Sequence, residues 1–176
     1  MFLKSFKNKS IENYLNKLLS ERHVNVNDKK IESLGIILNI DELSDFELFR
    51  ALGTLIKVHP NRLKIITYSS NEKDKLSSWD VCFNPKDFGW KGLIKNLELQ
   101  SFVDKKFDAL ISYYTSDELE LKLITASSKA QLKIGILQTD ERVNDLIIKT
   151  KLKDFKTFKS ELLKYLTILN KIENEE

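Results

Sequence analysis

Hydrophobic residues follow two patterns in the first part of the chain, one typical of helices and one typical of buried strands. Between Ser10 and Arg22 the apolar positions are three and four residues apart, which predicts an amphipathic helix with Ser10 as its N-cap. From Leu34 to Ile40 the apolar residues do not alternate with polar ones, which predicts a strand buried on both faces. We therefore expect a leading helix followed by a core strand.

A capped helix and a second strand are predicted next. Ser44 and Glu47 have the S-x-x-E spacing of a capping box, in which the two side chains satisfy free backbone donors at a helix start. We expect a helix from Phe46 and, directly after it, a strand from Leu63 to Tyr68. Strand, helix and strand in this order form a βαβ unit.

The same alternation returns in the second half of the chain. The spacing from Thr115 to Glu118 repeats the capping box. The middle of the chain is harder to assign, because residues 93–99 fit either a strand or a helix. The remaining predicted elements are short strands at 81–83, 132–137 and 146–149, a longer strand at 107–114, a helix after the second box and a last helix capped by Asp154.

These elements predict the fold class. Alternating strands and helices with right-handed crossovers form a Rossmann-like, doubly wound, mostly parallel sheet with helices on both faces. No repeat or Pro/Gly/Ser-rich linker interrupts the chain, so we expect one α/β domain over residues 1–176, with its amphipathic helix at about residues 10–22.

Composition indicates a cytoplasmic protein. The longest apolar run, from Leu34 to Ile40, is far shorter than the roughly 20 residues that cross a bilayer. A lone cysteine, Cys82, cannot form an internal disulfide. The 29 basic and 26 acidic side chains leave a net charge of +3, which creates no strong field for a polyanion. We therefore expect no specific binding to nucleic acid.

Two stretches resemble a known family. Residues 78–92 read SWDVCFNPKDFGWKG, and residues 107–114 read FDALISYY. Together they look like an uncharacterised family of unknown function from flavobacteria and related Bacteroidetes, and the resemblance covers nearly the whole chain. It implies a bacterial cytoplasmic protein of this size, but it brings no activity, substrate or catalytic residue.

A local likeness points to a second family. The chain reads FDALI at 107–111, LITASSKA at 123–130 and KIGI at 133–136. This order is similar to part of the heptosyltransferase-like glycosyltransferases. These short sequence motifs are common in α/β proteins, so the likeness implies an analogous fold and no transferase activity.

Standard catalytic and cofactor motifs are absent from the sequence. It contains no G-x-G-x-x-G, G-x-x-x-x-G-K-[ST], G-x-S-x-G or H-E-x-x-H. We therefore expect no cofactor. His23 and His59 have no His or Cys at metal-ligand spacing, so we expect no metal site, and we interpret Cys82 as a packing residue.

The strand ends are where a ligand site would form in such a sheet. Four residues near those ends are candidates for binding a small molecule: Asp41, Tyr68, Tyr114 and Thr139. Other polar residues would line the same cleft: Glu42, Thr67, Tyr113, Asp117, Gln138, Asp140 and Glu141. A bare helix N-terminus could hold a phosphate there, but Ser44 and Thr115 are better interpreted as caps.

Residues 79–90 concentrate aromatic side chains. If this segment is structural, its rings are buried, and we expect this for Trp90 because Gly89 and Gly92 flank it. If it is an interface, then Trp79, Phe88 and Trp90 are the residues that anchor a partner. A third interpretation is a ligand lid.

Two functional hypotheses follow. The first is a non-enzymatic interaction module that binds a protein partner or a second copy of itself. The second is an enzyme or binder of a sugar phosphate or nucleotide that uses the strand-end cleft. At the N-terminus, Phe2, Leu3 and Phe6 are interspersed with the lysines at positions 4, 7 and 9, a mixture that could lie in a lipid headgroup layer. Glu12, Glu21 and several asparagines dilute the basic face, so we do not expect membrane contact.

Overall fold

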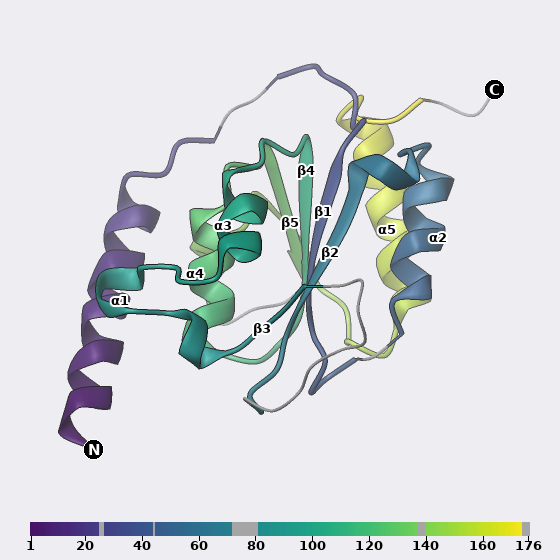
Figure 1. Ribbon diagram of the computed structural model, residues 1–176. Coiled ribbons are helices and arrows are strands. Elements are labelled where there is room, and N and C mark those ends of the chain that lie inside the picture. The colour runs from purple at the N-terminus through teal and green to yellow at the C-terminus, as the bar shows by residue number, and fades with distance from the viewer. Residues whose placement is uncertain (25–26, 44, 72–80, 137–139, 174–176) are drawn as a thin grey trace.

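A six-stranded parallel sheet forms the centre of the molecule (Figure 1). The computed structural model describes residues 1–24, 27–43, 45–71, 81–136 and 140–173. The strand order is β3-β2-β1-β4-β5-β6. The strands are β1 (Leu34–Asn39), β2 (Leu63–Tyr68), β3 (Val81–Phe83), β4 (Ala109–Tyr113), β5 (Leu132–Ile136) and β6 (Leu146–Ile148).

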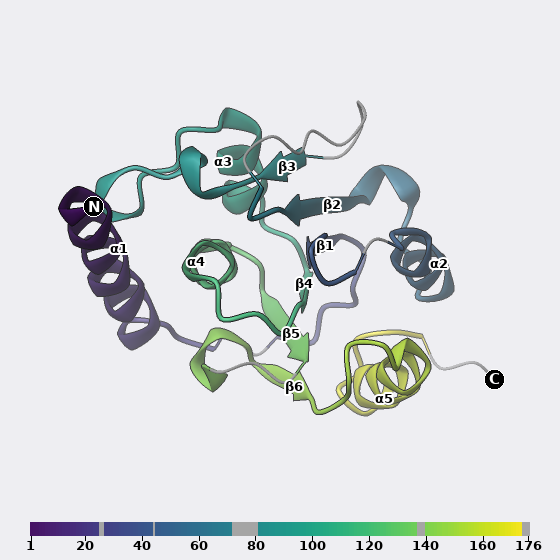
Figure 2. The same cartoon turned by 90° about the horizontal axis from the view of Figure 1, so that it is seen from below.

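Helices cover both faces of this sheet, as the sequence predicted. Figure 2 shows α2 and α5 on one side and α3 and α4 on the other, with α1 outside α4 as a further layer. The helices are α1 (Phe2–Ser20), α2 (Glu47–Leu55), α3 (Leu97–Asp104), α4 (Leu119–Ser127) and α5 (Phe155–Ile168). The Rossmann-like open α/β arrangement is therefore confirmed, with every strand pair parallel.

Hydrophobic clusters on the two faces of the sheet hold the layers together. On one face, Ile36 and Ile111 of the sheet pack with Phe49 of α2 and Phe158 of α5. On the other face, a second cluster joins β1, β2 and β4 to α3 and α4 and reaches Ile11 of α1. The central strand β1 is buried along its whole length, because it has helices on both sides. Each large side chain buried in this way contributes about 1.5 to 3 kcal/mol.

The predicted start of the first helix was wrong. The helix α1 begins at Phe2, so Ser10 lies in its third turn and is no N-cap. The hydroxyl of Ser10 donates to the Lys7 carbonyl oxygen at 2.8 Å and accepts from the Lys91 backbone N–H at 3.0 Å. The first two turns were missed because no apolar residue lies between Phe6 and Ile11, which interrupts the three- and four-residue spacing.

The predicted N-terminal caps of the other helices differ in how well they agree with the structure. The helix α2 begins at Glu47, one residue after the predicted start, while Ser44 lies outside the described residues. The second box is wrong, because Glu118 is the N-cap of α4 and makes no side-chain cap, and the Thr115 hydroxyl donates to Glu42 instead. Asp154 does cap α5, accepting from the Thr157 N–H at 3.2 Å.

No helix in the described part of the chain combines the length and the apolar composition needed to cross a bilayer. The longest, α1, has 19 residues, and lysines at positions 4, 7, 9 and 17 interrupt its apolar residues.

Candidate functional site

The strand order places a reversal of winding between β1 and β4. To one side of this point the sheet continues with β2 and β3, and to the other with β5 and β6. Open α/β sheets bind ligands in the crevice outside the carboxyl ends of such a strand pair. Here the segments that leave the two strands carry Asp41 and Glu42 after β1, and Thr115 and Ser116 after β4.

Hydrogen bonds join these two segments across the reversal. The side-chain N–H of Asn39, the last residue of β1, donates to the Ser116 hydroxyl at 2.9 Å. The carboxylate of Glu42 accepts from the Thr115 backbone N–H at 3.0 Å and from the Thr115 hydroxyl. The polar groups of both segments therefore satisfy each other, in the place where another member of this fold class would hold a ligand.

Two of the predicted site residues, Asp41 and Tyr68, make hydrogen bonds at the carboxyl ends of the strands. The Asp41 carboxylate accepts from the Ser70 N–H at 2.9 Å and from the Ser69 hydroxyl at 3.4 Å, so it ties the end of β1 to the end of β2. Tyr68 is buried, and its hydroxyl donates to Glu118 at 3.5 Å. Thr139 lies outside the described residues.

Tyr114 belongs to the interior. Its ring is fully buried, and its hydroxyl shares a hydrogen bond of 2.8 Å with the Thr125 hydroxyl on α4. Burial raises the pKa of the Tyr114 phenol. The structure therefore brings Asp41 and Tyr68 to neighbouring strand ends, and it packs Tyr114 with Tyr68 in the hydrophobic cluster between α4 and the sheet.

Two glutamates that the sequence analysis did not name as site residues, Glu118 and Glu120, act on the Tyr68 hydroxyl. Burial raises the pKa of Tyr68, and the negative charges of Glu120, Glu118 and Asp41 raise it further. Glu120 is itself buried, which raises the pKa of its carboxyl group. Tyr68 therefore stays a neutral hydrogen-bond donor. Sequence reasoning treated Glu118 as a cap and passed over Glu120, since a carboxylate inside a helical pattern usually faces water.

The other polar candidates at the strand ends have structural partners. The Thr67 hydroxyl donates to the Val81 carbonyl oxygen at 3.4 Å. On the same face of the sheet, the Tyr113 hydroxyl donates to the Leu152 carbonyl oxygen at 2.7 Å. Asp140 accepts from the Arg142 side chain, which lowers the pKa of this carboxyl group.

Within the described ranges, no three His, Cys, Asp or Glu side chains are placed to hold a metal ion. Gln138 lies outside those ranges.

The aromatic segment divides between core and surface. Phe83 and Phe88 are fully buried and pack edge to face, with their ring centroids 6.0 Å apart. Trp90 is 52% exposed, so the prediction that its ring fills the core is wrong. It lies on the short 3₁₀ helix η3 (Trp90–Gly92), which packs against α1 instead of the sheet. Trp79 lies outside the described residues.

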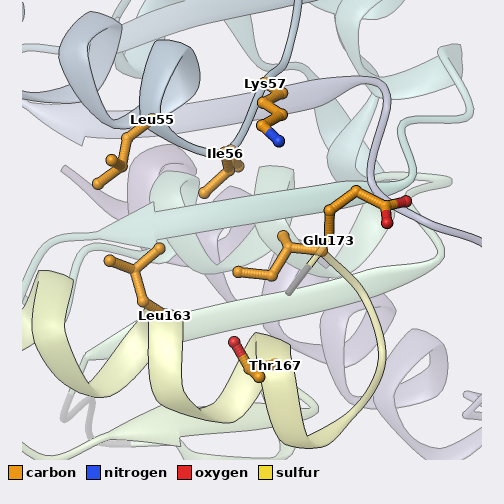
Figure 3. A pocket seen from close by; sticks show the side chains of 7 residues that line it. Leu55, Ile56, Lys57, Leu163, Thr167 and Glu173 are labelled. Atoms are coloured by element: carbon orange, nitrogen blue, oxygen red, sulfur yellow. The ribbon is translucent and has the colours of Figure 1, made fainter. Parts of the chain in front are cut away.

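Several hollows lie away from the carboxyl ends of the strands, and two of them have linings of different character. Figure 3 shows the first, of about 410 Å³, where Leu55 and Ile56 at the end of α2 face Leu163 and Thr167 of α5. The second, of about 380 Å³, lies at the amino ends of β4 and β5 and is lined largely by polar and basic side chains, including Arg22 and Lys133.

A family model matches residues 7–169 of the chain. The chain belongs to the family of unknown function DUF6913. The match runs from the second turn of α1 to the end of α5 and includes every strand of the sheet, so the DUF6913 model spans the whole layered arrangement. Comparison with curated proteins and with solved structures gives no match.

Membership of DUF6913 agrees with the resemblance to an uncharacterised family, and it assigns no reaction or ligand. The likeness of residues 107–136 to glycosyltransferases gains no support from these comparisons. Within the DUF6913 match, β4, α4 and β5 form the ordinary strand-helix-strand unit that such a stretch encodes.

Proposed function

We propose that this DUF6913 protein is a non-enzymatic interaction module that binds another protein through an apolar surface on α1 and η3. We call this the α1–η3 surface, and it consists of Phe2, Leu3, Phe6, Tyr14, Trp90 and Leu93. The observation that carries the proposal is the exposure of four aromatic rings on two elements that pack together outside the main layers.

Specific contacts support the alignment of the two elements. Phe6, Ser10 and Tyr14 are four residues apart, so they share one face of α1. On this face the Ser10 hydroxyl accepts from the Lys91 N–H at 3.0 Å. Gly92 has a positive φ of 74°, and a Cβ there would lie 2.8 Å from a Tyr14 ring carbon, so the glycine lets the Tyr14 ring lie against the η3 backbone. Trp90 therefore adjoins the same face.

The exposed fractions support a role in binding. Phe2 is 81% exposed and Phe6 is 61% exposed. Apolar side chains gathered on one surface, with aromatic anchors among them, are typical of protein-binding sites. The hollow between α2 and α5 has aliphatic residues but no aromatic ring in its lining, so it has less support as a docking site.

Charge supports a partner that differs from this chain. Lys4, Lys9 and Lys91 are exposed around the α1–η3 surface, and the first acidic residue of the chain is Glu12. Two copies of this surface would bring like charges together, which costs several kcal/mol across an interface. An amphipathic helix can instead lie in an apolar groove of its partner. We therefore propose a partner protein with an apolar groove and an acidic rim.

The alternative, a small-molecule binder or enzyme at the strand ends, has less support. Asn39 bonded to Ser116 and Glu42 bonded to Thr115 occupy the polar groups that would otherwise meet a ligand. A ligand would have to break both contacts to enter between β1 and β4.

The proposal is tested by affinity capture from native lysate with three tagged proteins: the parent chain, the double variant Phe6→Ser with Trp90→Ala, and the control Ile168→Ser. Ile168 is 67% exposed on α5, on the opposite side of the sheet. Its substitution removes an exposed apolar side chain, as the double variant does, but leaves the α1–η3 surface unchanged. We expect the parent and the control to capture the same stoichiometric partner, the double variant to lose it, and added salt to weaken it.

Several outcomes contradict the proposal. One is a partner retained by the double variant. Another is a homodimer of the purified parent by light scattering that the double variant dissociates, which would assign the surface to a second copy. Binding of the purified parent to anionic phospholipid vesicles, with no protein captured, would assign the surface to a membrane. A monomer that captures nothing specific also contradicts it.

A further inference from the structure

The second hollow lies at the opposite edge of the sheet from the strand ends discussed above. It occupies about 380 Å³, and its lining comes from the end of α1, the approach to β4, the loop between α4 and β5, and the residue before β6. Segments far apart in the sequence therefore meet there. The hollow is formed by the tertiary structure, unlike a cluster of lysines along one surface helix. The volume lies in the range of small-molecule sites, about 300 to 1,000 Å³.

Positive charge dominates this lining. Four cationic side chains, Arg22, Lys106, Lys129 and Lys133, face it together with a single carboxylate, Asp145. Asp145 is already engaged, because it accepts from the Arg22 side chain and from the Lys133 backbone N–H, the latter at 2.7 Å. Lys129 pairs with Asp104 at 2.6 Å. Within the described part of the chain, no carboxylate forms an ion pair with Lys106 or with the Lys133 ammonium group.

Lys133 is the unusual member of the group. It is the second residue of β5 and is only 5% exposed. Its ammonium nitrogen donates to the Ala126 carbonyl oxygen at 2.9 Å, near the end of α4. An ammonium group has three N–H donors, and among the described residues the remaining two have no acceptor. The charge of Asp145 acts on Lys133 without forming an ion pair with it. Burying a charge that has no ion-pair partner is costly, so this site favours an anion.

We propose that this hollow binds the phosphate group of a small phosphorylated molecule. Lys133 provides the charged donors at its base, Lys106 and Lys129 provide charge at its mouth, and the Arg22–Asp145 pair holds the wall. The Ser128 hydroxyl, which also lines the hollow, can donate to a further phosphate oxygen while it accepts from the Ala130 N–H. The site is independent of the α1–η3 surface, so either proposal can fail alone.

The test is titration calorimetry of the full chain with pyrophosphate at constant ionic strength. Saturable binding is expected for the parent, and Lys133→Met is expected to weaken it by about tenfold or more, because a charge-assisted hydrogen bond is lost. Lys153→Met is the matched control, since Lys153 is exposed before α5 and lies outside the lining. It should bind like the parent.

A second variant protects the test against a folding defect. Lys106 is exposed, so Lys106→Met should fold like the parent and still weaken pyrophosphate binding by about threefold or more. No saturable binding by the parent up to about 10 mM overturns the proposal. So does equal binding by Lys106→Met and the parent, or an equal loss in the Lys153→Met control.

Discussion

At the scale of single residues, two buried charged groups differ in how well hydrogen bonds satisfy them. Asp108, just before β4, accepts from the Lys29 ammonium group at 2.8 Å, from the Ser33 N–H at 2.9 Å and from the Glu32 N–H at 3.1 Å. Burial by itself would raise the pKa of Asp108, but these hydrogen bonds outweigh it, and the pKa is lowered. Lys133 has one acceptor, and burial lowers its pKa to about 8. Asp108 therefore stabilises the fold, whereas the charge of Lys133 destabilises it.

For Asp108 we predict a loss of stability on removal of its charge. Asp108→Asn should lower the free energy of unfolding at pH 7 by about 1.5 to 3 kcal/mol, because hydrogen bonds to an ionised group are replaced by weaker ones. A lowered pKa means that the contribution is present above the unfolded value near 3.8 and is lost as the pH falls through the folded value. Urea unfolding from pH 7 to pH 3 measures both effects.

The control for this experiment is Asp28→Asn, at an exposed position. It should change stability by less than about 0.5 kcal/mol. Equal stability of Asp108→Asn and the parent at pH 7 would contradict the role assigned to Asp108.

For Lys133 we predict a second rise of stability with pH, in the alkaline range. Its pKa is about 8 in the folded chain and 10.5 in the unfolded chain, so between these values the unfolded chain binds more protons and stability rises with pH. Arg22, Lys106, Lys129, His23 and Asp145 also face the hollow, and Arg22 contributes to the lowering. The measurement is the free energy of unfolding between pH 8 and pH 10.

The rise of stability due to Lys133 can be measured only up to about pH 10, because above it three buried tyrosines make stability fall with pH. Burial raises the pKa of Tyr113 to about 12 and also raises those of Tyr68 and Tyr114, so these phenols keep their protons in the folded chain above the ordinary value of 10.0. Lys133→Met should remove the rise below pH 10. A variant that keeps the full rise would show that another group causes it.

At the scale of elements, the segment from β3 to η3 joins the core to the outer layer. Asn84 begins this connection with a capping box, in which its side chain accepts from the Lys86 N–H and Asp87 accepts from the Asn84 N–H. Phe88 then enters the core, and two residues later the chain turns outward with Trp90 on η3. Neighbouring aromatic residues therefore have different roles.

This division predicts two different effects of aromatic truncation. Phe88→Ala should cost about 3 to 5 kcal/mol, because it leaves a cavity beside Phe83. Trp90→Ala should cost less than about 1 kcal/mol, since half of its ring already faces water. Thermal and urea unfolding of both variants measure the difference. A Trp90→Ala protein as unstable as Phe88→Ala would contradict the surface assignment.

At the scale of the whole molecule, sequence reasoning recovered the sheet and missed much of the outer layer. The strand β1 was predicted well, because burial on both faces leaves an unbroken apolar run. The helix α3 was ambiguous in the sequence, and the first turns of α1 were missed because no apolar residue lies between Phe6 and Ile11. An apolar pattern also does not show whether its residues are buried, since Phe2, Leu3 and Phe6 face water.

The rule for open sheets led the sequence analysis to the strand ends, but the bonding there could not be predicted. A ligand site at the ends of β1 and β4 stays a prediction. Thr115 was interpreted as a cap, yet its partner is Glu42, 73 residues earlier in the chain. Likewise, the flanking glycines suggested that Trp90 turns inward, whereas η3 packs against α1. Contacts between distant segments decide both cases, and local spacing does not contain them.

The central claim is that the α1–η3 surface binds another protein. Hydrogen–deuterium exchange, measured on the chain alone and in its complex with the captured partner, tests it most directly. We predict new protection in α1 and at residues 90–93, with exchange in α2 and α5 unchanged. Protection confined to α2 and α5, or to the strand ends around Asp41 and Ser116, would contradict the claim.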